Sequence, residues 1–149
     1  MARAKYQVLV LPYRKCEGKI LYCIFKRSDT DEWQFVAGGE EEDDSPLVSA
    51  KREALEEAGI APDERYTELE TCCSISTEHF KKARSIWGAD CLVIPEYAFA
   101  VEVSADISIS NEHTDFEWVD YETAVTRLKF DSNKTALWEL DNKIKLGLI

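Results

Sequence analysis

The stretch GGEEEDDSPLVSAKREALEEAGI, residues 38–60, decides how the rest of this sequence is interpreted. Ser45 and Pro46 are typical of a helix start, because a serine hydroxyl caps free backbone N–H groups and proline suits the first helical position. Gly59 is typical of a helix end, since glycine readily adopts the left-handed conformation that stops a helix. The stretch therefore predicts a helix that begins at Pro46 and stops at Gly59.

Three carboxylates of this predicted helix share one face. At about 100° per residue, Glu53, Glu56 and Glu57 point the same way. The opposite face is predicted to pack against the protein and carries Leu47, Ala54, Leu55 and Ala58. Glu53 and Glu57 are like charges four residues apart and destabilise the helix by roughly a few tenths of a kcal/mol. A hard divalent cation bound by carboxylate oxygens would offset this repulsion; the alternative is a solvated acidic face with an Arg52–Glu56 pair.

The same positions resemble the Nudix box, a motif written G-x5-E-x7-R-E-U-x-E-E-x-G-U, in which U is aliphatic. Every fixed place matches except Asp44, which stands where the family has glutamate. The substitution shortens one box carboxylate by a methylene group, which affects an outer hydrogen bond more than the metal centre. The resemblance implies an α/β fold, the Nudix α/β/α sandwich with a mixed β-sheet, and hydrolysis of a diphosphate linkage that depends on Mg²⁺ or Mn²⁺.

The resemblance also implies the metal ligands. These are Glu53, Glu56 and Glu57, with the backbone carbonyl of Gly38 beside them. Arg52 is implied to orient a box glutamate, and its spacing of four residues from Glu56 fits that role.

The sequence leaves three carboxylates as candidates for the general base. Glu53, Glu96 and Glu112 all correspond to places where family members carry a catalytic or additional metal-binding carboxylate. Water activated by one of them would attack phosphorus while metal ions neutralise the oxygens that gain charge.

A wider resemblance extends beyond the box and implies the substrate-binding residues. Residues 25–27, 31–35, 111–113 and 118–119 are similar to segments of Nudix proteins. Residues 130–136, the Trp33-Gln34 pair and Glu96 are similar to a narrower branch, the dihydroneopterin triphosphate pyrophosphohydrolases. Lys26 and Arg27 are expected to hold the phosphates that do not react. Trp33 is expected to stack on a base or pterin ring.

Composition limits the class of protein. The 149 residues are 45% hydrophobic, enough for a single domain over residues 1–149. No stretch reaches the roughly 20 apolar residues of a membrane span, and we expect a cytoplasmic protein without a membrane partner. The net charge of −11 disfavours a nucleic-acid polymer as partner. The acidic run at residues 40–44 is interpreted as a solvated loop, and the five cysteines as reduced core thiols.

The remaining sequence predicts a mixed-sheet α/β fold. Strands are expected at residues 6–11, 20–25, 33–36, 66–75, 92–103 and 116–119. Helices are expected at residues 121–128 and 134–146, and an irregular segment at residues 76–90.

The expected activity is release of pyrophosphate from a small phosphorylated molecule, dihydroneopterin triphosphate or a nucleoside triphosphate. Two alternatives stay open. One is a Nudix hydrolase of another nucleoside diphosphate derivative, such as a dinucleoside polyphosphate or a nucleotide sugar. The other is a catalytically silent module that binds a nucleotide.

Overall fold

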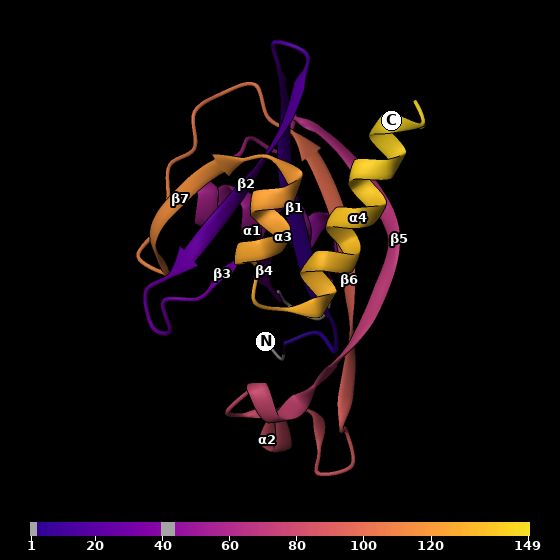
Figure 1. Cartoon of the computed structure of the whole chain (residues 1–149). Coiled ribbons are helices and arrows are strands. Elements are labelled where there is room, and N and C mark those ends of the chain that lie inside the picture. The colour runs from indigo at the N-terminus through magenta and orange to yellow at the C-terminus, as the bar shows by residue number, and fades with distance from the viewer. Residues whose placement is uncertain (1–2, 40–43) are drawn as a thin grey trace.

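A seven-stranded mixed sheet forms the centre of the computed structural model, which describes residues 3–39 and 44–149 (Figure 1). Most of the acidic run, residues 40–43, lies outside the described residues. In chain order the elements are β1 (Gln7–Cys16), β2 (Lys19–Arg27), β3 (Trp33–Gln34), β4 (Val36–Gly38), α1 (Pro46–Ala58), β5 (Arg65–Ser76), the 3-10 helix η1 (Thr77–His79), α2 (Ala83–Trp87), β6 (Val93–Glu102), β7 (His113–Val119), α3 (Tyr121–Arg127) and α4 (Asp131–Lys145).

The strand order explains how the sheet is mixed. The main path runs β3-β2-β1-β6-β5, while β4 pairs with β1 and β7 pairs with β2. Strands β1 and β6 run parallel, and the other pairs among the described strands run antiparallel. The expected mixed sheet is confirmed.

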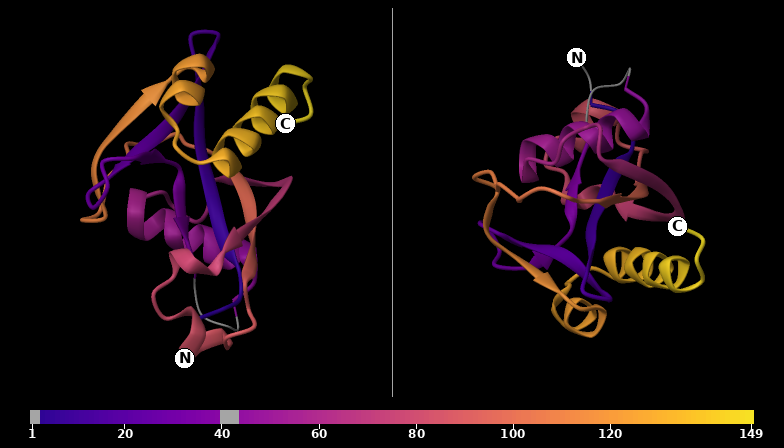
Figure 2. Two further views of the ribbon diagram at one scale, coloured as in Figure 1. Left: turned by 60° about the horizontal axis from the view of Figure 1, so that its bottom comes forward. Right: turned by 90° about the horizontal axis from the view of Figure 1, so that it is seen from above.

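Side chains alternate between the two faces of the sheet. Along β1, Val8 and Val10 join the core beneath α1, whereas Leu9 and Leu11 join the core beneath α3 and α4. The view from above in Figure 2 shows α1 on one side of the strands and α3 and α4 on the other. This is the α/β/α sandwich that the box resemblance implies.

Helix α1 has the predicted ends but packs through a different face. Ser45 caps it with its hydroxyl, which accepts a hydrogen bond from the Val48 N–H, and Gly59 ends it in the left-handed conformation at φ 67°. The prediction that Leu47 and Leu55 pack is wrong, because they are 41% and 47% exposed. The buried side instead carries the small residues Ser49, Ala50, Ala54 and Ala58, together with Glu53 and Glu57. Small side chains let the helix axis approach the sheet closely, which leaves no room for leucine.

The strand predicted at residues 33–36 is two strands. β3 pairs with β2, and β4 pairs with β1, so the chain changes its partner at Phe35. There the Phe35 N–H donates to Asn133 Oδ1 at 2.8 Å instead of to a strand. A hydrogen bond to a residue 98 positions away leaves no local signal in the sequence.

The segment predicted to be irregular, residues 76–90, contains η1 and α2. Together with the adjoining ends of β5 and β6 it projects from the body of the molecule (Figure 1), and we call residues 75–94 the arm. Ala83, Trp87 and Ile94 form a small separate core in the arm. The Arg3 guanidinium stacks on the ring of Trp87, whose indole N–H donates to the Arg3 carbonyl. The N-terminal segment thus holds the arm against the body.

Two further sequence expectations concern the cysteines and membrane-spanning helices. All five cysteines are free, but only Cys23 is buried, so the prediction of core thiols fails for the others, which lie at strand ends, on an edge strand or in the arm. Within residues 3–39 and 44–149, no helix is long and apolar enough to cross a membrane.

Candidate active site

Two of the three box glutamates face inward. Glu53 is 9% exposed and Glu57 is 4% exposed, whereas Glu56 is exposed. The predicted separation of a packing face from a carboxylate face is therefore wrong. Helix α1 buries two carboxylates beside its alanines, at the side where β4 ends.

Gly38 allows this burial by lacking a side chain. A Cβ atom at this position would lie 2.5 and 2.7 Å from the two carboxylate oxygens of Glu53, closer than real Cβ contacts. The backbone at the end of β4 therefore touches the Glu53 carboxylate directly. This close approach gives the first box glycine a physical reason that does not depend on a positive φ.

The loop before β7 adds a fourth carboxylate. A cavity of about 340 Å³, which we call the carboxylate cavity, is lined by Glu53, Glu56, Glu57, Ser110, Asn111 and Glu112. The Ser110 N–H donates to the Glu57 carbonyl at 3.2 Å, and the Ser28 N–H donates to the Glu112 carbonyl at 3.0 Å. These hydrogen bonds hold the loop between the end of α1 and the end of β2.

Glu57 is strongly perturbed by its surroundings. Burial, hydrogen bonding with Glu112 and repulsion from Glu53 raise the pKa of Glu57 to about 10, and the nearby Arg27 opposes this shift. Glu57 Oε2 is buried without a hydrogen-bond partner. Buried carboxylate oxygen of this kind is costly unless a cation or a donor meets it.

The donor set fits a hard divalent cation. Carboxylate oxygens from α1 and the loop, and the backbone at Gly38, supply the oxygen ligands that Mg²⁺ and Mn²⁺ prefer. The orphaned Glu57 oxygen points to the same conclusion. Within the described part of the chain, no three His, Cys, Asp or Glu side chains already converge on one ion position, so binding of a common ion would require these glutamate side chains to rotate.

Arg52 pairs with the residue that departs from the box. Its Nη2 lies 3.1 Å from Asp44 Oδ2, rather than in the Arg52–Glu56 pair that the spacing suggested. Asp44 is fixed in turn, because its carbonyl accepts a hydrogen bond from the Tyr6 hydroxyl at 2.7 Å. Asp44 and Arg52 thus brace the start of α1 against its middle, and the shorter side chain still makes the outer contact.

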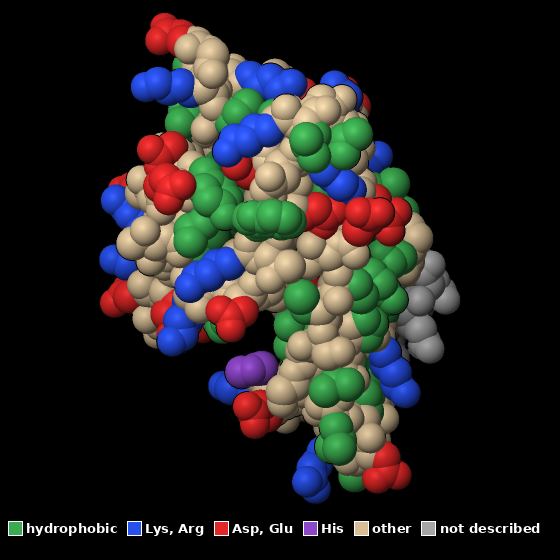
Figure 3. Space-filling model, turned by 45° about the vertical axis from the view of Figure 1, so that its right-hand side comes forward, with side chains coloured by type: hydrophobic (Ala, Val, Ile, Leu, Met, Phe, Trp, Pro, Cys, Tyr) green, Lys and Arg blue, Asp and Glu red, His purple; other side chains and the backbone are tan. Residues whose placement is uncertain are grey.

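A second, larger cavity lies between the body and the arm. This arm cavity of about 570 Å³ is lined by Gln7, Arg27, Thr30, Glu32, Gln34, Ala37, Ile75, His79, Phe80, Glu96, Lys129, Phe130, Ser132 and Asn133. The surface is visibly hollowed beside the arm in Figure 3. Glu96 lies here and Glu112 lies in the carboxylate cavity, a separation that the sequence could not give.

Arg27 lies in the arm cavity and acts electrostatically on the carboxylate cavity. It lines the arm cavity, and its charge acts on both Glu57 and Glu112. Asp29 accepts two hydrogen bonds of 2.7 Å from its guanidinium. Lys26, the other residue expected to bind phosphate, lines neither cavity. Its Nζ lies 4.0 Å from Asp31 Oδ1.

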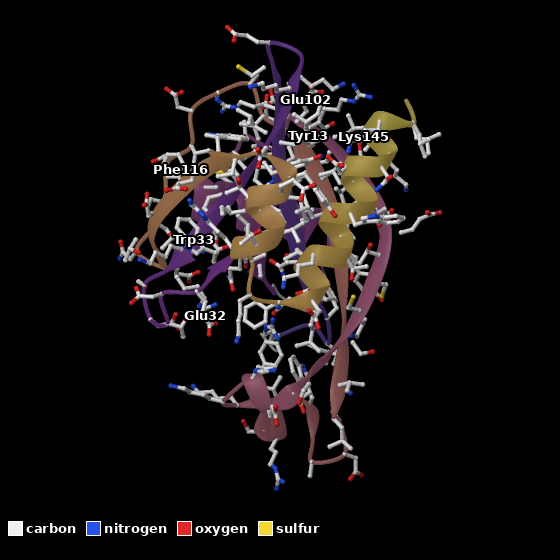
Figure 4. All side chains as sticks on the ribbon, viewed as in Figure 1. Tyr13, Glu32, Trp33, Glu102, Phe116 and Lys145 are labelled. Atoms are coloured by element: carbon white, nitrogen blue, oxygen red, sulfur yellow. The ribbon has the colours of Figure 1, made fainter. Side chains whose placement is uncertain are left out.

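Trp33 does not line the arm cavity. It packs against the core beneath α3 and α4, and the Arg127 guanidinium lies 5.7 Å from its ring centroid. Figure 4 places it beside Glu32, which does line the cavity. Neighbours on an extended chain point to opposite sides, which explains why Glu32 faces the cavity and Trp33 the core. The aromatic side chains of the cavity are Phe80 and Phe130.

Several lining residues were missed from the sequence. Phe80 and His79 belong to the segment predicted to be irregular, where no periodic pattern singles them out. Gln7 lies within a predicted strand and gave no chemical signal. Ser132 and Asn133 carried one signal, because they fall in the segment that resembles the pterin-specific branch.

Comparison with known proteins identifies the family. The NUDIX domain model matches residues 5–138, so the chain belongs to the Nudix family. The dihydroneopterin triphosphate diphosphatase of Haemophilus influenzae is 34% identical over 132 residues, which cover 87% of this chain and 83% of that protein. Membership and this relative make the chain an enzyme that hydrolyses diphosphate linkages.

Solved structures agree on the fold. A Listeria monocytogenes protein assigned to the NUDIX hydrolases is 39% identical with a TM-score of 0.84, and the match covers 95% of each chain. The Escherichia coli dihydroneopterin triphosphate pyrophosphohydrolase is 21% identical with a TM-score of 0.75, and the match covers 95% of this chain and 99% of that one. At that identity the second likeness concerns the fold alone.

Proposed function

We propose that the protein is a Mg²⁺-dependent pyrophosphohydrolase, also served by Mn²⁺, that converts a small ring-bearing triphosphate to its monophosphate and pyrophosphate. Dihydroneopterin triphosphate is the first substrate to test and a nucleoside triphosphate the second. The observation that carries the proposal is the pairing of two cavities through Arg27: buried carboxylates on one side and a space for a ring on the other. The H. influenzae relative supports the choice of dihydroneopterin triphosphate.

The carboxylate cavity would hold the metal. Glu53, Glu56 and Glu57 are the proposed side-chain ligands, and the Gly38 carbonyl is a proposed backbone ligand, since the backbone of Gly38 lies close to the Glu53 carboxylate. A bound divalent cation neutralises phosphate oxygens that gain charge during hydrolysis. The cation would also offset locally the net charge of −11, which would otherwise repel a polyphosphate.

Glu112 is the proposed general base. It is exposed on a loop and lines the same cavity as the three ligands, so it can take a proton from the attacking water without leaving the metal short of a ligand. Glu53 is the competing candidate, but contact with Gly38 restricts its movement. Glu96 lies in the other cavity and is not proposed as the base.

Arg27 would hold the phosphates between the cavities. Its guanidinium offers planar pairs of N–H donors that match phosphate oxygens. Asp29 already uses one such pair, which sets the direction of the side chain and leaves the remaining donors for the substrate. Lys26 stays a phosphate-binding candidate only from the surface, since it lines neither cavity.

A substrate panel tests this proposal. Purified protein with Mg²⁺ is offered dihydroneopterin triphosphate, nucleoside triphosphates, a dinucleoside polyphosphate and a nucleotide sugar, while pyrophosphate and phosphate are detected separately. We expect pyrophosphate from a triphosphate and little turnover of the last two. Glu112→Gln should lower kcat about 100-fold or more with little change in the Mg²⁺ requirement, as expected for a general base. Phosphate as the main product, or a silent protein, would overturn the proposal.

A further inference from the structure

We propose that Glu96 selects the substrate ring by accepting hydrogen bonds from the adjacent ring N–H and amino group of a 2-amino-4-oxopyrimidine, the grouping that pterins and guanine share. The inference rests on the proposed function, since it assumes that the arm cavity receives the ring of a triphosphate. It assigns Glu96 to binding rather than to the chemistry at phosphorus.

The position of Glu96 separates it from the reacting centre. It is 4% exposed and lies near the start of β6, where its Cα pairs with Gln7 of β1 on one side and with Cys73 of β5 on the other. Its side chain lines the arm cavity and not the carboxylate cavity. A group so placed can touch the ring of a bound substrate while the phosphates lie at the other cavity.

The carboxylate is held by neutral partners. Gln7 Nε2 donates to Glu96 Oε2 at 3.1 Å, and Ser132 also forms a hydrogen bond with this carboxyl group. Burial raises the pKa of Glu96, and the two hydrogen bonds oppose that shift. Because neutral partners compensate a buried charge only in part, a ligand that brings further N–H donors would stabilise this group.

The orientation of Gln7 is fixed as well. Its amide oxygen accepts a hydrogen bond from Arg3 Nη2 at 3.3 Å, so its amide nitrogen must face Glu96. Two neutral donors leave acceptor sites of the carboxylate free, since an ionised carboxylate has about four lone-pair positions. Glu96 therefore presents an acceptor pair in a set direction within the cavity.

Ring chemistry decides which bases match this pair. A 2-amino-4-oxopyrimidine ring offers two neighbouring donors that can bind one carboxylate together. Hypoxanthine keeps the ring N–H but lacks the amino group, and adenine presents an unprotonated ring nitrogen that would face the carboxylate. A bidentate contact of this type discriminates against the wrong base by about 5 to 150-fold.

The cavity suits a bicyclic ring in size and surroundings. Its volume of about 570 Å³ lies in the usual range for small-molecule sites, roughly 300–1,000 Å³. Phe80 and Phe130 line it and offer aromatic faces for stacking. Ala37 lines the arm cavity, and the next residue, Gly38, touches Glu53, so the ring and the reacting phosphates would lie on neighbouring stretches of β4.

Binding measurements test the proposal without any need for turnover. Calorimetry compares guanosine monophosphate with inosine monophosphate, which differ only by the 2-amino group. In the wild-type protein we expect guanosine monophosphate to bind about 5 to 150-fold more tightly. Equal affinities, or no binding of either at millimolar concentration, would overturn the inference even if triphosphates are hydrolysed.

Glu96→Gln then tests whether this residue is responsible. The amide keeps the size but replaces one acceptor with a donor, which opposes the ligand amino group. The ratio of kcat/KM for GTP over ITP should fall towards 1, mainly through the KM for GTP. Equal losses of kcat on both substrates would instead make Glu96 part of the catalytic machinery and contradict the inference. Thermal melting verifies that the variant is folded.

A direct comparison of two substrates determines whether the cavity fits a pterin or a guanine better. Dihydroneopterin triphosphate and GTP carry the same 2-amino-4-oxopyrimidine, and the substrate with the higher kcat/KM identifies which molecule the cavity fits better. Failure of every triphosphate to react would defeat the proposed function, while the monophosphate binding comparison would still decide the role of Glu96.

Discussion

The two cavities use buried carboxylates in opposite ways. In the carboxylate cavity burial and the neighbouring Glu112 and Glu53 raise the pKa of Glu57, and its Oε2 has no hydrogen-bond partner. In the arm cavity burial raises the pKa of Glu96, and hydrogen bonds from the neutral groups of Gln7 and Ser132 oppose this rise. A bound cation would relieve the first arrangement, and the second can accept hydrogen bonds from neutral donors of a ligand. Hydrolysis and ring selection should therefore respond to different substitutions.

The largest expected effect is the loss of activity in Glu57→Gln. The amide keeps the size of the side chain but removes the charge that holds a hard cation. We expect kcat/KM to fall by about 100-fold or more on every substrate at limiting Mg²⁺, more than the loss expected for a residue that only orients a ligand. The matched control is Glu122→Gln, an exposed glutamate on α3. Wild-type rates for Glu57→Gln would contradict the metal assignment.

Arg52→Ala should reduce activity less than Glu57→Gln does. The pair between Arg52 and Asp44 joins the start of α1 to its middle, and in the proposed site it would orient the glutamates without adding a ligand. Metal use should weaken by roughly 10 to 100-fold, the usual cost of losing a supporting contact. Measuring the Mg²⁺ dependence and the melting temperature of Arg52→Ala beside those of the exposed Arg84→Ala separates orientation from unfolding. Activity that follows the melting temperature alone would count against the orienting role.

The α1 side of the carboxylate cavity could be predicted because Glu53, Glu56 and Glu57 are close in sequence, whereas Glu112 lies far along the chain and was indicated by the family resemblance alone. Ser45, Pro46 and Gly59 set the ends of α1, and a helix then places Glu53 and Glu57 four residues apart on one side. The inward direction of these glutamates could not be predicted, because it depends on where β4 ends. Most strands followed from local pattern, and the sandwich followed from the resemblance; the division of residues 33–36 into β3 and β4 did not.

The arm cavity depends on tertiary contacts, so most of its residues could not be predicted from the sequence. Its walls come from β1, the β2–β3 turn, β4, β6, the arm and the start of α4, so no local spacing describes it. The Phe35–Asn133 hydrogen bond, which divides β3 from β4, joins residues 98 positions apart. Trp33 was assigned to ring stacking because indole can stack, but burial against the core beneath α3 and α4 gives it another neighbour.

Glu139→Gln should weaken the attachment of α4 to β5 rather than the proposed metal site. Glu139 joins α4 to β5 by accepting hydrogen bonds from the backbone N–H groups of Glu70 and Thr71 and from Lys143. Burial favours a higher pKa, but these bonds outweigh it and lower the pKa of Glu139 to about 2. Replacing it should reduce the free energy of unfolding at pH 7 by about 1.5 kcal/mol.

The pH dependence of that difference follows from the lowered pKa. The stabilisation is present above the unfolded value of 4.5 and is lost as pH falls towards the folded value of about 2. Denaturant unfolding of both proteins at pH 7, 4 and 3 should therefore show the gap between wild type and Glu139→Gln narrowing. A gap that is constant over this range would mean that the charge of Glu139 contributes nothing.

The smallest functional effect is expected for Trp33→Ala. Since Trp33 packs against the core and does not line the arm cavity, KM for a ring-bearing substrate should change by less than about twofold, while stability falls by about 2 kcal/mol. Phe130→Ala is the matched comparison, because Phe130 does line the cavity, and it should raise KM about fivefold or more. A large KM change confined to Trp33→Ala would restore Trp33 as the stacking residue.

Binding of Mn²⁺, followed by electron paramagnetic resonance, tests most directly whether the two cavities have separate roles. Wild-type protein, Glu57→Gln and Glu96→Gln are titrated with the ion in the absence of substrate. We expect Glu57→Gln to lose affinity by about 10-fold or more, since it removes a charged ligand, and Glu96→Gln to bind Mn²⁺ as the wild type does. Unchanged binding by Glu57→Gln, or loss of binding by Glu96→Gln, would contradict the assignment of the metal to the carboxylate cavity.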